Sequence, residues 1–488
     1  MLEQKIDTLI KLLYGVKSEK INPAQLQLLL EGIDPPEKPQ APSGSEEQSP
    51  EEGNDAKSKN KKTKAKNHSR LKGWDTLEVT EQTIFPEGYE ENKDQLELIG
   101  QEVTEQLDYE PARLIKRRSI RLKFRNKTAR QQAPLVAPAP ASPLPGGIPT
   151  FSLTAHLIVS KYADHLPLYR QQSILQRLGL HAPRDTLNHW TLQSLELLQP
   201  IAEAIHQECL SQSYLQIDES PIKELAPGTG KTRTGYVWAF NDPCPQGSVS
   251  YRWQNGRSRK NFEQTLGEHH GKWAGIFQVD GYGVYPSYQK NHEGIDLGSC
   301  FTHIRRYFIK ALDAKERDAA CILHLIQYLY QIEEQLRQKQ AGPALREAIR
   351  ASHSAPRLKL IRKYLERIKS RHLPKSHMGK AIAYALAQWR GLDNYLADGR
   401  VELCNNLVEN AIRPLKLGSK NYLFFGSQRG GELACVAYTL IANSNRHGLA
   451  LNDYLTEAMK ALVEYGPNRA GELTPAAISK ARRLHKSA

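Results

Sequence analysis

Cysteine is scarce in this sequence and absent from its first two fifths. The chain of 488 residues contains six cysteines, and the first of them is Cys209. No two cysteines have the short C-x-x-C spacing that holds a structural zinc ion, so we predict no zinc site. We read the six as isolated, reduced thiols, which places the protein in a reducing compartment.

Long apolar runs are missing as well. A membrane-spanning helix needs about 18 uninterrupted apolar residues, and no segment of the chain approaches that length. The first residues, MLEQKIDTLIKLLYG, include acids early and lack the small-residue cleavage site of a signal peptide. We therefore expect a soluble, cytoplasmic protein that has no membrane partner.

Acidic residues are outnumbered by basic ones. The chain has 67 Lys and Arg against 53 Asp and Glu, and its formal net charge is +14. This excess favours a polyanionic partner, although charge alone does not separate nucleic acid from an acidic membrane surface.

Composition and hydropathy patterns divide the chain into successive segments. Stretches rich in lysine or in Pro, Ser and Gly have no apolar period and are predicted to be linkers, whereas regular apolar periods indicate folded units. The predicted segments are an N-terminal helical segment (1–33), a disordered charged linker (34–72), a small basic β-rich unit without zinc cysteines (73–128), a Pro-rich linker (129–149), a helical, helix-turn-helix-like region (150–212) whose second helix is capped by Asp185, a core (213–460) with a helical insertion at about 311–400, and a C-terminal tail (461–488).

The last strand of the basic unit has one apolar and one cationic face. Three apolar residues alternate with three basic ones, and a strand puts alternate side chains on opposite faces. A solvated face usually mixes charges of both signs, so we predict that the basic side chains contact DNA phosphates. These predicted DNA-contact residues are Arg121, Lys123 and Arg125.

The core segment has an α+β pattern. Apolar runs predict strands at YLQIDES, GYVWAFND, SVSYRWQN and GIFQVDGYG, with a helix at KNFEQTLGEHH. A meander of antiparallel strands followed by a helix, a strand and further helices is consistent with an RNase H-like sheet. Beyond it, CFTHIRRYF is read as a strand that ends at His303, and RVELCNNLVENAIRPL as a helix that Pro414 ends.

Two of these strands carry an aspartate at the C-terminal end of an apolar run. Asp218 ends LQID and Asp280 ends FQVD, positions where an unpaired acid costs roughly several kcal/mol unless it binds a metal. A polar helix bearing Glu409 follows. Three such carboxylates can hold two magnesium ions roughly 3.5–4 Å apart, which clamp both oxygens of an in-line displacement. The sequence thus predicts a site for two Mg²⁺, with Mn²⁺ expected to substitute.

The predicted helix around Glu409 is polar on one face and is followed by basic, aromatic and glycine residues. Such a segment can approach a phosphate chain closely and offer rings for base stacking. Its aromatic residues are Tyr422, Phe424 and Phe425. The predicted DNA-contact residues here are Arg413, Lys416, Lys420 and Arg429, and the candidate site-orienting residues are His303, Asn405 and Asn406.

At these residues the chain resembles the insertion sequence 66 family of bacterial DDE transposases. The resemblance covers about residues 149–460 and rests on SKYADHLPLYRQ, IDESPIKEL, QVDGYGVYPSY, CFTHIRRYF and NNLVENAIRPLKLGSKNYLFFGSQRGG. It implies that the family's catalytic acids fall on Asp218, Asp280 and Glu409. It also implies cleavage of DNA at the ends of an insertion sequence and transfer into target DNA, by a homo-oligomer on DNA and with possible companion proteins.

One departure from the family and two alternative functions stay open. Relatives commonly carry a cysteine-rich, zinc-ribbon-like module that this chain lacks. That loss favours a transposase-derived protein that binds DNA without cutting it, whereas the three acids argue for an enzyme. An RNase H-like nuclease or junction resolvase is the other alternative, but the helical insertion and the basic segment after Glu409 fit a transposase better.

Overall fold

The computed structural model describes residues 114, 123–124, 135–136, 141–144, 148–226 and 228–487. The chain divides into two compact units, Met1–Leu114 and Ile115–Ala488, and the described helices and strands belong to the second. The predicted N-terminal helical segment and charged linker lie outside the described residues, as do Arg121 and Arg125. Of the basic strand, β1 (Lys123–Phe124) is described, paired antiparallel with β2 (Leu135–Val136).

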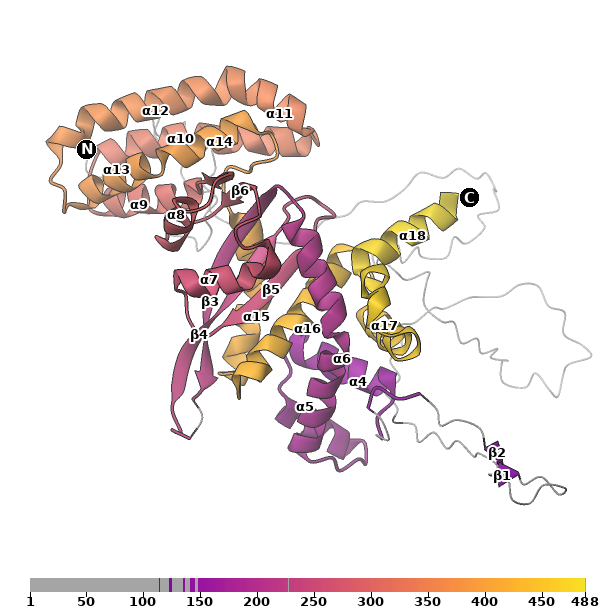
Figure 1. The fold of residues 1–488 in the computed structure, drawn as a ribbon. Coiled ribbons are helices and arrows are strands. Elements are labelled where there is room, and N and C mark those ends of the chain that lie inside the picture. The colour runs from indigo at the N-terminus through magenta and orange to yellow at the C-terminus, as the bar shows by residue number, and fades with distance from the viewer. Residues whose placement is uncertain are drawn as a thin grey trace, which may run out of the picture. The chain divides into compact units, whose positions relative to one another are not determined.

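A five-stranded mixed sheet forms the centre of the second unit (Figure 1). Its order is β5-β4-β3-β6-β7; the first three strands are antiparallel, and β3, β6 and β7 are parallel. This mixed architecture is consistent with the predicted α+β class. The strands are β3 (Tyr214–Leu225), β4 (Thr232–Asn241), β5 (Val249–Gln254), β6 (Gly275–Gln278) and β7 (Ile295–Gly298).

Helices pack on both faces of the sheet. Within the described part of the chain, no helix is both long enough and apolar enough to cross a membrane. The helices outside the insertion are α4 (Phe151–Tyr162), α5 (Leu168–Arg177), α6 (Arg184–Leu210), α7 (Arg259–Leu266), η3 (Gly267–His269), α8 (Val284–Gln289), α9 (Phe301–Asp313), α15 (Asn406–Tyr422), α16 (Gln428–Arg446), α17 (Leu451–Tyr465), η6 (Pro467–Leu473) and α18 (Pro475–Ser487).

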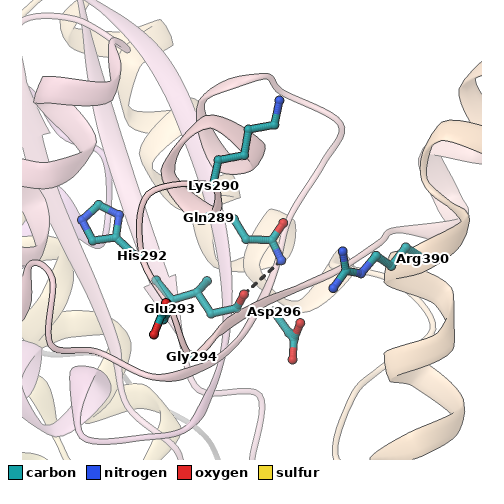
Figure 2. A pocket seen from close by; sticks show the side chains of 8 residues that line it. Gln289, Lys290, His292, Glu293, Gly294, Asp296 and Arg390 are labelled. Atoms are coloured by element: carbon teal, nitrogen blue, oxygen red, sulfur yellow. Dashed lines mark hydrogen bonds between the residues drawn. The ribbon is translucent and has the colours of Figure 1, made fainter.

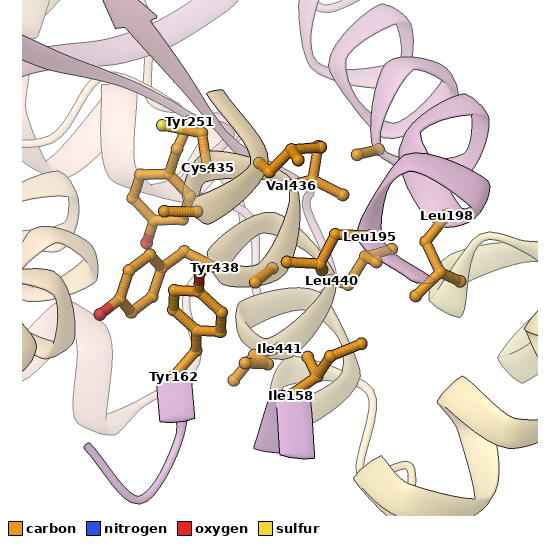
Figure 3. Packing of buried hydrophobic residues seen from close by; sticks show 14 of the residues in the cluster. Ile158, Tyr162, Leu195, Leu198, Tyr251, Cys435, Val436, Tyr438, Leu440 and Ile441 are labelled. Atoms are coloured by element: carbon orange, nitrogen blue, oxygen red, sulfur yellow. The ribbon is translucent and has the colours of Figure 1, made fainter. Parts of the chain in front are cut away.

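Alternate side chains of β4 fill two separate cores. Val237 and Ala239 belong to a large cluster that α4, α6, α15, α16 and α17 complete. Figure 3 shows the centre of this cluster, where Tyr438 of α16 lies with its ring centroid 5.4 Å from that of Tyr162. Trp238 and Phe240 point to the other face and pack with α7 and α8. Alternation along one strand therefore fixes which helices cover which face.

Both edges of the sheet are covered. Asn443 of α16 bonds the backbone of Val249 in edge strand β5, donating to its oxygen at 2.6 Å and accepting from its nitrogen at 3.0 Å. At the other edge, Asn394 donates to the Leu297 oxygen of β7 at 2.9 Å. Gly391 packs there so closely that a Cβ would lie 2.2 Å from Ser299 Oγ. Covered edges cannot pair with strands of other chains.

A helical insertion between α9 and α15 has its own hydrophobic core, into which α9 also packs. Its buried Arg350 forms a two-point ion pair with Glu333, at 2.8 and 2.9 Å. Arg350 also donates to the backbone oxygen of Tyr395 at 3.0 Å. Nearby, Arg346 pairs with Glu402 at 2.7 Å, which ties the insertion to the segment that leads into α15. The insertion contains α10 (Asp318–Gln338), α11 (Pro343–Ile349), the π-helix η4 (Arg350–Ser354), α12 (Ala355–Ile368), η5 (Lys369–Arg371), α13 (His377–Ala387) and α14 (Trp389–Ala397).

Four local predictions were wrong. His303 lies in the first turn of α9, not at a strand end, because CFTHIRRYF buries Phe301, Ile304 and Phe308 at helical spacing. Pro414 lies inside α15 without ending it; its side chain is exposed while the opposite face of α15 stays packed in the core.

The other two concern element boundaries. Asp218 lies within β3 rather than at its end, since pairing with β4 continues to Leu225. Asp185 does not cap α6, which starts at Arg184 after Pro183. The domain boundaries that we drew remain predictions.

A buried polar network joins β3, β6 and the start of α15. Gln216 Nε2 donates to Gln278 Oε1 at 2.8 Å and to the Cys404 oxygen at 3.1 Å. Gln278 Nε2 donates to the Glu402 oxygen at 2.6 Å, and Tyr214 donates its hydroxyl to Gln278 Oε1 at 2.6 Å. Both glutamines are fully buried, so each bond replaces one that water would otherwise make.

Replacing Gln216 with methionine should lower the free energy of unfolding by about 1–3 kcal/mol, because the Cys404 oxygen and the Val408 N–H lose their buried partner. Gln338→Met, at an exposed position of α10, is the matched control and should change stability by less than about 0.5 kcal/mol. Urea unfolding of the two variants measures this difference. If both variants lose the same amount of stability, the hydrogen bonds of the Gln216 amide do not contribute to the free energy of unfolding.

Candidate functional site

The pairing of β3 with β6 brings the two predicted aspartates together. Gln216 lies opposite Gln278 in this parallel register. Asp218 lies two residues beyond Gln216 on the same face of β3, and Asp280 lies two residues beyond Gln278 in the loop that leaves β6. The charge of Asp280 also raises the pKa of Asp218, which is consistent with neighbouring carboxylates.

Helix α15 adds Glu409 to this group. Glu409 lies in the first turn of α15, and the preceding Val408 donates its backbone N–H to Gln216 Oε1 at 3.2 Å. The helix therefore starts over the part of β3 that bears Asp218. The charge of Glu409, too, raises the pKa of Asp218. Asp218 is thus within electrostatic range of Asp280 and Glu409, and the three predicted acids lie on a strand, a loop and a helix.

Asp218 is electrostatically strained. Burial raises the pKa of its carboxyl to about 7, and repulsion from Glu219, Asp280 and Glu409 adds to the effect, against one hydrogen bond from the Glu219 N–H at 2.9 Å. Asp280 Oδ1 accepts one backbone N–H, from Tyr282 at 2.9 Å. Carboxylates gathered in this way repel one another unless a cation joins them.

Glu409 faces two residues of α9. Arg306 donates to Glu409 Oε2 at 3.2 Å, and His303 Nε2 lies 3.9 Å from Oε1. Burial lowers the pKa of His303, and the neighbouring Arg306 lowers it further. The imidazole is therefore held neutral, and Arg306 carries the positive charge beside Glu409.

Glu219 lies on the opposite face of β3, as strand alternation predicts. Arg257 pairs with its carboxylate at 3.0 Å, and Tyr285 donates its hydroxyl to it at 2.8 Å. The guanidinium of Arg257 also lies 3.6 Å from the ring centre of Tyr282, two residues after Asp280. This cluster supports β3 and the loop after β6 from the face of the sheet opposite Asp218. It also keeps the Glu219 carboxylate on that opposite face, away from Asp218 and Asp280.

The donor set fits a hard divalent cation. Asp218, Asp280 and Glu409 supply oxygen ligands of the kind that magnesium takes. Asn405 lies one helical turn before Glu409, and both polar atoms of its fully buried side chain have no protein partner. Among the described residues, however, no three Asp, Glu, His or Cys side chains are arranged so that they could hold one ion, and Glu409 pairs with Arg306.

The predicted DNA-contact residues of this region separate into two groups. Arg413 and Lys420 are exposed on α15, and Lys416 of the same helix donates to the Pro221 oxygen at 3.1 Å. Burial lowers the pKa of Lys416 while the charge of Asp218 opposes this, so the ammonium group is within electrostatic range of Asp218. Arg429 lies on α16 instead and pairs with Glu196 and Glu432, both at 3.2 Å.

A surface hollow of about 400 Å³ lies away from the acids, beside β7. Figure 2 shows Arg390 across it from the Gln289–Asp296 loop, where Gln289 donates to the Ile295 oxygen at 3.0 Å. Its lining mixes charges of both signs, and none of the three acids belongs to it. The hollow therefore gives no indication of a second catalytic site.

Sequence reasoning missed Arg306, Gln216 and Gln278. The two glutamines had a visible signal, because Q-x-D occurs at both QID and QVD. Arg306 was missed because CFTHIRRYF was read as a strand. On a helix, His303 and Arg306 are three residues apart and share a face.

Comparison with known proteins identifies the family. The sequence profile of the transposase IS66 family matches residues 146–433. The chain is 32% identical to the uncharacterized protein y4jD of Sinorhizobium fredii over 381 residues, which are 75% of this chain and 73% of that protein. It is also 32% identical to the uncharacterized protein y4qI of the same organism over 385 residues, 76% of this chain and 70% of the relative. The chain belongs to the IS66 family of transposases.

Proposed function

We propose that this chain is a DDE transposase whose Asp218, Asp280 and Glu409 form a magnesium-dependent site on an RNase H-like sheet. The observation that best supports the proposal is the register of β3 and β6, which pairs Gln216 with Gln278, each two residues before an aspartate, while Val408 at the start of α15 bonds Gln216. An antiparallel meander continued by two parallel strands supports the RNase H-like assignment.

The proposed reaction has two in-line displacements at phosphorus. Water first attacks the phosphodiester at the element end and the 3′-oxygen leaves; the freed 3′-hydroxyl then attacks target DNA, where another 3′-oxygen leaves. When bound, two magnesium ions supply positive charge to the attacking and leaving oxygens. Asp218, Asp280 and Glu409 would hold them, and Arg306 beside Glu409 can neutralise phosphate charge once Glu409 turns to the metal.

DNA is proposed to follow α15. Lys416 lies within electrostatic range of Asp218 while Arg413 and Lys420 are exposed on the same helix, so a phosphate chain that reaches Asp218 meets these charges. Arg121, Lys123 and Arg125 are proposed to hold phosphates of the element end elsewhere. Arg429 would contribute less, because its guanidinium is engaged by two glutamates.

Asp218→Asn, Asp280→Asn and Glu409→Gln should each lower DNA cleavage by at least about 100-fold, since the site loses a ligand worth several kcal/mol of transition-state stabilisation. DNA binding should change little. Asp296→Asn, an exposed acid of β7, is the control and should cut normally. Cleavage of a labelled element end measures all four variants; near-native activity of any one of the first three would show that its acid is not a ligand.

Magnesium should stabilise the protein more as pH rises. The pKa of Asp218 is raised to about 7, so between about pH 4 and pH 7 the folded protein holds a proton that the unfolded chain has released. Without divalent ions, stability should therefore fall through this window as pH rises. Protons compete with the cation, so the magnesium-induced rise in Tm should grow over the same window.

Scanning calorimetry in EDTA and in excess magnesium tests this pH dependence. Asp218→Asn should weaken both trends, because the amide does not titrate and is a poorer ligand, while Glu219, whose pKa burial also raises, keeps part of the pH dependence. A magnesium effect that is independent of pH in the native protein would contradict the assignment.

The double variant Lys416→Gln, Lys420→Gln should lower the salt dependence of DNA binding. Each lost phosphate contact reduces the slope of log affinity against log salt by about 1, so we expect a change of about 2. Cleavage should fall while Tm stays nearly constant. The control replaces the exposed Lys460 and Lys480 of α17 and α18 with glutamine; an equal slope change there would point to general charge rather than to these positions.

A further inference from the structure

The chain makes a strained turn where α15 ends. Leu423 has φ 67° and ψ −46°, a left-handed conformation that a leucine rarely adopts. Phe424 donates its N–H to the Tyr422 oxygen at 2.8 Å, so residues 422–424 form a tight γ-turn of the strained type. Strain of this kind persists where surrounding structure imposes it.

The surrounding structure that imposes the strain is the anchoring of Phe425. Its backbone N–H donates to the Lys223 oxygen at 2.9 Å, and its oxygen accepts from Leu225 at 2.8 Å, so it pairs with β3. Its ring is buried, with centroids of Tyr422 at 5.3 Å and of Trp253 at 5.2 Å. The chain must therefore turn sharply between the helix and this anchor.

The turn holds two apolar side chains in solvent. Leu423 is 65% exposed and Phe424 is 39% exposed, and Leu417 on the last turns of α15 is 51% exposed. Of the aromatic run that the sequence indicated for base stacking, Phe425 is thus inside the protein and Phe424 outside. The fold maintains a strained backbone and thereby presents apolar groups to water.

Basic residues lie next to this apolar tip. Lys420 is three residues before Leu423, and the exposed Lys223 accepts the Phe425 N–H through its backbone oxygen, whereas Glu224 of the same strand is buried and paired with Arg233 at 3.1 Å. A stable protein interface needs roughly 1,000 Å² of buried surface, far more than two or three side chains offer. A small apolar tip beside cationic residues instead suits duplex DNA, into which apolar side chains insert between base pairs.

We propose that Leu423 and Phe424 form a wedge that enters the base stack of duplex DNA lying along α15. The inference rests on the proposed function, because it takes DNA as the partner and the acids as the point of cleavage. Tyr422 lies 13 residues after Glu409 on the helix, about 20 Å at 1.5 Å per residue. At about 3.4 Å per base pair, the wedge opens a step roughly six base pairs from the cleaved phosphate.

The test places 2-aminopurine at successive positions of a duplex that carries the element end. Its fluorescence rises when the base unstacks, and binding of the full-length protein should give a severalfold rise at about six pairs from the cleaved bond. The variant Leu423→Gly, Phe424→Ala should lose this rise. Its Tm should not fall, because glycine adopts a positive φ without strain.

Two further measurements separate the wedge from a general effect. A duplex with a mismatch at the opened step should be cleaved equally well by the double variant and by the native protein, since the mismatch removes the unstacking cost. Leu345→Ala, which truncates a leucine 51% exposed on α11, should leave the fluorescence unchanged. If the native protein binds and cuts DNA but the double variant gives the same rise in fluorescence, the wedge is wrong and the proposed function stands. The same conclusion follows if the double variant changes the oligomeric state and leaves the fluorescence unchanged. Failure of the native protein to bind DNA overturns the proposed function as well.

Discussion

The pairing of two buried glutamine amides is the constraint on which the site depends. A buried amide must use its donors and acceptors within the protein, and Gln216 and Gln278 do so by bonding each other and the oxygens of residues 402 and 404. The bond between the two amides accompanies the parallel register that pairs Gln216 with Gln278. Each glutamine precedes an aspartate by two residues, so this register brings the segments that bear Asp218 and Asp280 side by side.

The two faces of β3 differ in how their carboxylates are partnered. Behind the strand, Glu219 pairs with Arg257 and accepts from Tyr285, although burial still raises its pKa. In front, burial raises the pKa of Asp218, and repulsion from Glu219, Asp280 and Glu409 adds to the effect. Asp218 accepts one hydrogen bond, from the Glu219 N–H. Shifted pKa values of this kind cluster at functional sites and also occur in structural ion-pair networks.

The sequence was sufficient to nominate the three acids, since an acid after an apolar run is costly without a partner. It was also sufficient for the strands of the meander, which form clear apolar runs. The sequence did not predict β7, which has only four residues. It also predicted a strand around His303, because the helical period there was hidden in a mixed aromatic and basic run. The Arg306–Glu409 pair joins residues far apart in the chain, and no local pattern encodes such a contact.

The covered sheet edges limit how copies of this chain can assemble. Asn443 bonds both backbone groups of Val249 in β5, Thr439 accepts the Tyr251 N–H, and Asn394 of α14 bonds the Leu297 oxygen of β7. These contacts hinder another copy of the chain from continuing this five-stranded sheet. Shortening the insertion past α14 would remove the cover of β7, so the length of this segment protects the folded protein from edge-to-edge aggregation.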